Sequence, residues 1–290
     1  MTEIRRSGAE TLDSAALSDL GSRLLRQPAR VVFWEGPPAQ AIYLGRGLSL
    51  DVHRHHATQI TISLGEPVSV LTDHNGSVSR QQSFVVGPNV AHGIEAEETP
   101  IIEIFSEALA LADLAQRLRM AAQSETPPLP SDLLDGLWPH LVLVGDRMLN
   151  GETEEALVSD LVSRLLVSGF DDVGEPRVAA ARSLVTPEFL LAEDQPIQAL
   201  ASHVHLSTSR FRHLWREEMG VSIQSYLRWQ RLLTAMQDTA GGASLTEAAH
   251  GAGFADSAHL TRVFRATFGI APSRIFKNSH SVQVITADTK

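Results

Sequence analysis

Three histidines and one glutamine in the first third of the chain have residue types and spacings that suit a ligand site. His53 and His55 are separated by one residue, Gln59 follows four positions later, and His92 comes after a Gly-Pro-Asn turn at 87–89. Alternate side chains of a β-strand point to the same face, so a strand here would place His53 and His55 together. Three neutral imidazoles and an amide oxygen can hold a divalent metal ion.

The sequence alone leaves three roles open for these four side chains. As hydrogen-bonding groups in a pocket they would bind a small polar effector, which is the role that the sequence favours. As metal ligands they would lack a carboxylate, so neither a resident metal nor any other cofactor is predicted. As packing or surface residues they would bind nothing, and His56, which would point the opposite way, is assigned to that class. No catalytic residue is predicted.

The region around these side chains has the pattern of a small all-β domain. Apolar runs at 41–44, 59–64, 68–71, 83–86 and 101–105 are separated by turn residues at 36–38, 73–76 and 87–89. Many short strands at this spacing predict a small β-barrel or jelly roll. Apolar residues at helical spacing predict helices over 11–27, 107–122, 131–149 and 152–168.

Part of this region resembles a cupin. The stretch from Gly47 through His53, His55 and Gln59 to Gly65 follows the cupin metal motif, with Gln59 in the place of its glutamate. Residues 86–92 follow the second cupin stretch, with an asparagine in the place of a glycine. The resemblance implies a cupin-like effector domain. It also raises an alternative, a cupin-type metal-dependent enzyme with an appended helical domain, against which Gln59 argues.

A second set of functional residues lies in an internal repeat near the C-terminus. Residues 207–222 and 256–271 match at an offset of 49, and their apolar residues have the spacing of one buried helix face. A shorter predicted helix, starting at Pro196 or capped by Ser244, precedes each copy. Each copy has an N-cap and a terminal glycine suited to the left-handed conformation, namely Ser207 and Gly220, then Asp256 and Gly269. This is the helix-turn-helix pattern, present twice.

Residues 177–278 resemble the DNA-binding domain of the AraC/XylS family of bacterial regulators. The matching features are Leu200-Ala201, Leu206-Ser207, Phe211, Trp215, Gly220, Tyr226-Leu227, Arg231, Ala235, Ala249, Gly253-Phe254, Asp256, Phe264, Phe268-Gly269 and Pro272. The departures are Ala248 for a larger aliphatic residue, Trp215 for a phenylalanine, and Ile275-Phe276-Lys277 where the family has Tyr-Arg. The resemblance implies two reading helices that enter successive major grooves, about 34 Å apart.

The resemblance also implies which side chains would contact DNA. On the first reading helix the outward residues are Thr208, Ser209, Arg212, His213 and Arg216, and on the second they are Ser257, Ala258, Thr261, Arg262 and Arg265. Arginine can bridge the O6 and N7 atoms of guanine, so Arg212 and Arg262 are predicted to contact bases. Arg216 and Arg265 are better placed for phosphates.

Charge and composition narrow the classes of protein further. The net charge is −10, yet residues 1–176 carry −13 and residues 177–278 carry +3, which confines the positive charge to the predicted DNA-binding region. The absence of cysteine excludes disulfides and thiolate sites. With no signal peptide pattern and no apolar run of membrane-spanning length, a cytoplasmic protein is predicted.

The predicted organisation is an α+β multidomain chain. It has an N-terminal helical arm (1–30), a cupin-like β-barrel effector domain (31–106), a helical connector (107–169), a linker (170–176), an all-α double helix-turn-helix (177–278) and a flexible tail (279–290). An apolar stripe including Leu157 and Leu161 in the connector would either pack on its own domain or form a homodimer.

The predicted function is a sequence-specific DNA-binding transcription regulator. The prediction is an activator controlled by a small-molecule effector, with an operator DNA and RNA polymerase as its partners and no membrane association. A regulator that senses nothing, and works through its abundance or a protein partner, is a further alternative.

Overall fold

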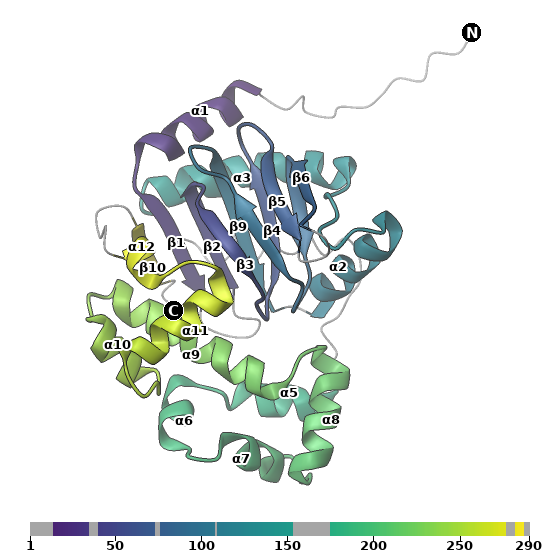
Figure 1. Ribbon diagram of the computed structural model, residues 1–290, viewed down its shortest axis with the longest axis vertical. Coiled ribbons are helices and arrows are strands. Elements are labelled where there is room, and N and C mark those ends of the chain that lie inside the picture. The colour runs from purple at the N-terminus through teal and green to yellow at the C-terminus, as the bar shows by residue number, and fades with distance from the viewer. Residues whose placement is uncertain are drawn as a thin grey trace.

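The computed structural model of the protein describes residues 14–34, 40–72, 76–107, 109–152, 175–276 and 282–286 (Figure 1). The sheet domain, within residues 14–152, contains α1 (Ser14–Arg26), β1 (Ala29–Trp34), β2 (Gln40–Arg46), β3 (Ser49–His53), β4 (Thr58–Ser63), β5 (Val68–Thr72), β6 (Val78–Gln81), β7 (Ser83–Val86), β8 (His92–Glu95), β9 (Pro100–Ser106), α2 (Leu109–Ala122) and α3 (Ser131–Leu149). The predicted helix over 152–168, its apolar stripe and the predicted linker fall almost wholly outside the described residues.

The strands form two sheets that face each other. One has the order β10-β1-β2-β9-β4-β7 and the other β3-β8-β5-β6, where β10 is Val282–Thr286. Apolar side chains from both sheets, including Val70, Phe84 and Ile94, pack between them. Among the described residues, only an isolated bridge between Gly47 and Glu97 joins the sheets. The predicted barrel is therefore an open two-sheet sandwich, because a closed barrel needs continuous pairing around its circumference.

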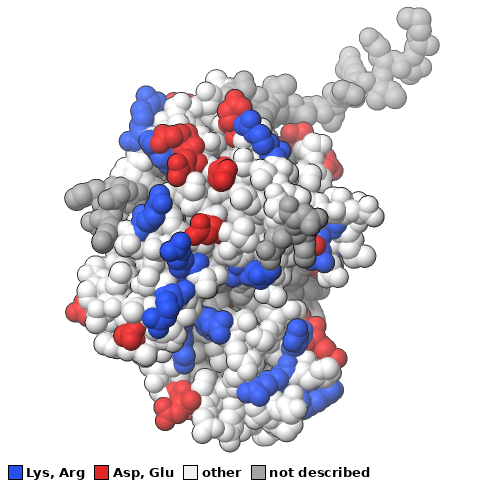
Figure 2. Space-filling model, viewed as in Figure 1, with Lys and Arg blue, Asp and Glu red and all other residues white. Residues whose placement is uncertain are grey.

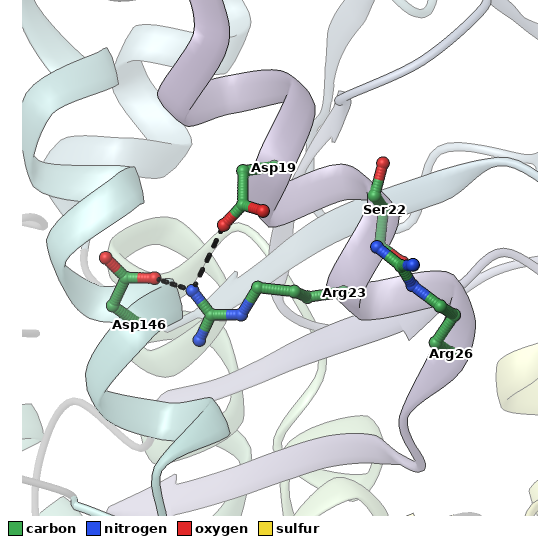
Figure 3. Close-up of polar contacts among 5 residues, drawn as sticks. All are labelled: Asp19, Ser22, Arg23, Arg26 and Asp146. Carbon is green, nitrogen blue, oxygen red and sulfur yellow. Dashed lines mark hydrogen bonds and ion pairs between the residues drawn. The ribbon is translucent and has the colours of Figure 1, made fainter.

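Helices cover the other face of the six-stranded sheet (Figure 1). Leu20 and Leu24 of α1 are fully buried against strands β2 and β9 and helix α3. The Arg23 guanidinium donates to Asp146 of α3 at 2.6 Å and lies 3.5 Å from Asp19 of its own helix (Figure 3). The predicted helical arm thus contains helix α1, which packs on the core of the sheet domain through Leu20 and Leu24.

The helical domain (175–276) confirms the predicted repeat. Its helices are α5 (Pro176–Ser183), α6 (Pro187–Ala192), α7 (Pro196–His203), α8 (Thr208–Met219), α9 (Ile223–Ala240), α10 (Leu245–Gly251), α11 (Ser257–Phe268) and α12 (Pro272–Phe276). Ser207 and Asp256 cap α8 and α11 as predicted, and Gly220 and Gly269 end them with a φ of 68° each. Helices α7–α8 and α10–α11 are the two helix-turn-helix units, and α9 connects them.

The two domains share a hydrophobic cluster. Val31 and Ala41 of the sheet domain are buried in one cluster with Leu232, Phe264 and Ile270 of the helical domain. The second DNA-facing helix therefore shares a core with the sheet domain, although the linker predicted at 170–176 separates the two domains along the chain. Apolar spacing along a helix identifies a face that will be buried, but it does not identify the element that covers the face.

The C-terminal segment 279–290, predicted to be a flexible tail, contains strand β10. This strand pairs in parallel with β1, from Ala29 opposite Val282 to Phe33 opposite Thr286 (Figure 1). Four β-branched residues among five favour an extended strand, and β1 would otherwise be an unpaired sheet edge. Because the pairing is long-range, the sequence pattern of the tail alone did not reveal it.

Candidate DNA interface and effector site

The two reading helices each bury an apolar face and expose a polar one. On α8, Phe211 and Trp215 are fully buried, and Leu260 and Phe264 are buried on α11. The predicted DNA-contacting residues lie mostly on the opposite faces. Those that are exposed are Ser209, Arg212, His213, Arg216, Ala258, Arg262 and Arg265, while Thr208, Ser257 and Thr261 are partly exposed.

Basic side chains gather over the helical half of one face of the molecule, and acidic side chains are frequent over the sheet half (Figure 2). This agrees with the uneven charge of the sequence, +3 over residues 177–278 against −13 before them. A cationic face on paired helices is the electrostatic feature that phosphate binding requires.

The second reading helix is docked on the sheet domain at its C-terminal end. Arg265 forms an ion pair of 2.8 Å with Asp51, and the Asp51 backbone N–H donates to the Gly269 carbonyl at 2.9 Å. Both side chains of the ion pair are about two-thirds exposed, so solvent weakens it. The backbone contact and the shared apolar cluster therefore contribute more to docking than the ion pair does. In this arrangement Arg265, which is predicted to contact a DNA phosphate, is already paired with Asp51.

The predicted effector residues converge in the sheet domain. His53, His55 and His92 are buried, and one ring nitrogen of each lies within 4.8 Å of those of the other two. His53 ends β3 and His92 begins β8, whereas His55 lies in the turn after β3 and not on the strand. Gln59 joins the group from β4, because its side-chain oxygen lies 2.7 Å from His55 Nε2 and 3.0 Å from His92 Nε2.

Backbone carbonyls orient all three rings. Nδ1 of His53, His55 and His92 faces the carbonyl oxygen of Asp51, Ala57 and Val90, at 2.8, 2.8 and 3.1 Å respectively. A carbonyl oxygen can only accept, so the single proton of each neutral ring belongs on Nδ1. Burial, and then the neighbouring imidazole of His55, lower the pKa of His53 to about 3, and burial lowers the pKa of His55 and His92 as well. The rings are therefore neutral at pH 7, and their Nε2 atoms carry lone pairs.

This arrangement fits a divalent cation. Imidazoles held through Nδ1 by backbone carbonyls are the usual outer support of metal-bound histidines. The Gln59 amide donates to Thr61 at 2.9 Å and to Glu103 at 3.0 Å, which leaves its oxygen facing the lone pairs of His55 and His92. A cation among these atoms would satisfy them. A rotated Gln59 amide would satisfy them too, by donating to both rings and accepting from Thr61 and a protonated Glu103.

Glu103 is a member of the site that sequence reasoning missed. It lies on β9 opposite Thr61 and is buried, and burial raises the pKa of its carboxyl to about 7. The sequence does contain a feature that points to Glu103, because it is a lone charged residue within the apolar run Ile101–Phe105. His56, assigned to packing or the surface, is buried at the domain interface against Tyr226 and Trp229.

An apolar cavity of about 80 Å³ adjoins the histidine cluster. Its polar part consists of His53, Gln59 and Glu103. Its apolar walls come from both domains and include Tyr43, Leu50, Trp229, Leu233 and Phe268. An occupant of this cavity would contact the sheet domain and helices α9 and α11 together.

Comparisons with known proteins identify the helical domain. Residues 200–278 match the family described as "Helix-turn-helix domain". The arabinose operon regulatory protein of Escherichia coli K12 is 28% identical over 148 residues, which cover 47% of this chain and 50% of that protein. An uncharacterised HTH-type transcriptional regulator of Bacillus subtilis, YfiF, is 25% identical over 81% of each chain. The chain spans half or less of the length of the first curated relatives that it matches.

A solved structure extends the similarity to the whole fold. An apo ToxT variant from Vibrio cholerae superposes with a TM-score of 0.50 at 11% identity, over 84% of this chain and 98% of ToxT. None of the helices within the described residues is long and apolar enough to cross a membrane. With a sheet-rich N-terminal domain joined to a paired helix-turn-helix domain, the chain has the fold of ToxT and resembles the transcription regulators of the AraC/XylS family.

Proposed function

We propose that the chain is an effector-controlled activator that binds a specific operator through α8 and α11. The observation that supports it most is the repeat itself, two capped reading helices with buried apolar faces and exposed Arg212 and Arg262. Two such helices on one chain suit two successive major grooves. RNA polymerase and a second copy of the chain are the partners proposed for activation.

Operator binding by the full chain should depend steeply on salt. Each phosphate neutralised by an arginine releases counterions, so a protein with six or more such contacts loses at least about 10³-fold in affinity between 50 and 200 mM salt. Selection of bound fragments from genomic DNA, followed by titration at several salt concentrations, measures this. A folded chain that binds no DNA pool in a salt-dependent way would contradict the proposal.

The effector site in this proposal is the cluster of His53, His55, Gln59 and His92. A divalent metal ion is the occupant that suits the four lone pairs best, and it would supply a Lewis-acidic point at which an oxygen ligand can be held. The relatives named above are regulators, and Gln59 stands where the cupin motif has a carboxylate, so a regulatory role is preferred over catalysis.

Asp51 gives the site a direct connection to the second reading helix. Its carbonyl accepts from His53, its N–H donates to the Gly269 carbonyl, and its carboxylate pairs with Arg265. An occupant that shifts His53 would thus shift the contact that holds α11. Because a ligand acts only through different affinities for two states, the docked and released arrangements of α11 are the two states proposed.

His55→Ala and His92→Ala should abolish the effector response and leave operator binding near normal. Each removes one of the converging ring nitrogens, and neither residue lies on a reading helix. The measurements are metal content of the purified chain, the melting shift on adding zinc, nickel or manganese, and operator affinity with and without the ion. His140→Ala, on α3, is the matched control. A metal content or melting shift that survives in both cluster variants would place the metal elsewhere.

A further inference from the structure

A second cleft between the domains is polar and cationic. Its volume is about 350 Å³, within the range of small-molecule sites. One wall is the turn of the sheet domain that carries Arg54 and His56, and the other is the α8–α9 junction with Arg216 and Arg228. The lining contains three arginines and no acidic residue. Among the described residues, Arg216 and Arg228 form no ion pair.

His56 lines this cleft as a buried polar group that lacks a hydrogen bond. It is 7% exposed, and neither ring nitrogen has a hydrogen-bond partner among the described residues. Its Nε2 lies 3.9 Å from Glu107, which accepts from the Gln230 amide at 2.8 Å. Burial raises the pKa of Glu107 to about 8, so this carboxyl is mostly uncharged at pH 7 and repels an anion little. A buried imidazole without a partner is costly unless a ligand supplies one.

The first turn of α9 completes the lining. Ser222 and Ser225 both face the cleft, their hydroxyl oxygens lie 2.9 Å apart, and Ser222 caps the helix. This helix has 18 residues, so its N-terminus carries the partial positive charge of a full helix dipole. Hydroxyl donors, a helix N-terminus and arginines are the groups that bind oxyanions in proteins.

We propose that this cleft binds a small oxyanion, a metabolite with a phosphate or carboxylate group. Arg228, Arg216 and His56 would contact it across the domain boundary, together with the first turn of α9. A DNA backbone suits the cleft less well, because the sheet domain lines one side of it and His56 is only 7% exposed. His55 lines this cleft and also belongs to the histidine cluster, but the proposal requires no occupant in that cluster.

The test uses the full chain with inorganic phosphate and citrate as probes, each at ionic strength matched with potassium chloride. Binding is measured by calorimetry and by the melting shift. Arg228→Gln should weaken binding of whichever probe the wild type holds by about tenfold or more, since a charge-assisted hydrogen bond is lost. Arg80→Gln, an exposed arginine on β6 outside the cleft, should leave it unchanged.

Each outcome of this experiment decides the proposal. Stabilisation by phosphate, by citrate or by both, lost in Arg228→Gln and kept in Arg80→Gln, supports it and shows which anion class binds. Equal stabilisation of all three proteins would mean a general salt effect and would overturn it. No effect of either anion would also overturn it, and weaker DNA binding by Arg228→Gln would then assign that arginine to the DNA backbone.

Discussion

Arg262→Ala is expected to weaken binding of the full chain to its preferred operator by about 5- to 150-fold. Loss of a bidentate arginine contact to guanine costs about 1–3 kcal/mol. Arg262 is exposed on α11, whereas Arg265 on the same helix is paired with Asp51. Arg262 is therefore the basic residue of that helix that is available to DNA without prior release. The measurement is affinity for the operator and for variants of it at each base position.

The way in which the loss of affinity varies among DNA sequences distinguishes base contacts from phosphate contacts. Arg262→Ala, and Arg212→Ala on α8, should also relax preference at particular base positions. Arg216→Ala should instead weaken all sequences alike and reduce the salt dependence. Equal losses on operator and random DNA for Arg262→Ala and Arg212→Ala would reassign both residues to the phosphate backbone.

Gly269→Ala is expected to separate α11 from the sheet domain. A Cβ at this position would overlap the Asp51 carbonyl oxygen, and it would lie 2.7 Å from His53 Nδ1 and 2.9 Å from the Asp51 nitrogen. The backbone at position 269 and the backbone at Asp51 cannot both keep their positions after this substitution. The hydrogen bond between Asp51 and residue 269 must therefore break. We expect a loss of about 2–3 kcal/mol in the free energy of unfolding, from left-handed strain together with the lost contact. Operator affinity without effector should rise, and its response to effector should fall.

Gly220→Ala is the matched control for this prediction. Gly220 ends α8 with the same φ of 68°, but a Cβ there would meet nothing within 4 Å. It should cost only the left-handed strain, about 1–2 kcal/mol, and leave effector control intact. Unfolding by denaturant, with operator titrations of both variants, measures the difference. If the two variants behave alike in stability and in effector response, the docked arrangement does not control DNA binding.

The sequence by itself determined the local features of this chain. Caps, terminal glycines and apolar spacing depend on residues within one or two helical turns, so both reading helices could be predicted from them. The four residues of the candidate effector site could be named for a similar reason, since they belong to two short motifs. The convergence of His55 was predicted from strand alternation, although it lies in a turn.

The features that depend on contacts between residues far apart in the sequence were decided only by the tertiary structure. Glu103 joins the site because β9 pairs with β4, and β10 joins the sheet by pairing with β1 from the far end of the chain. The docking of Gly269 on Asp51 joins residues more than 200 positions apart. No periodicity in either segment encodes its partner, because burial patterns mark a face and not what covers it. The connection from the histidine cluster to the second reading helix therefore became visible only in the folded chain.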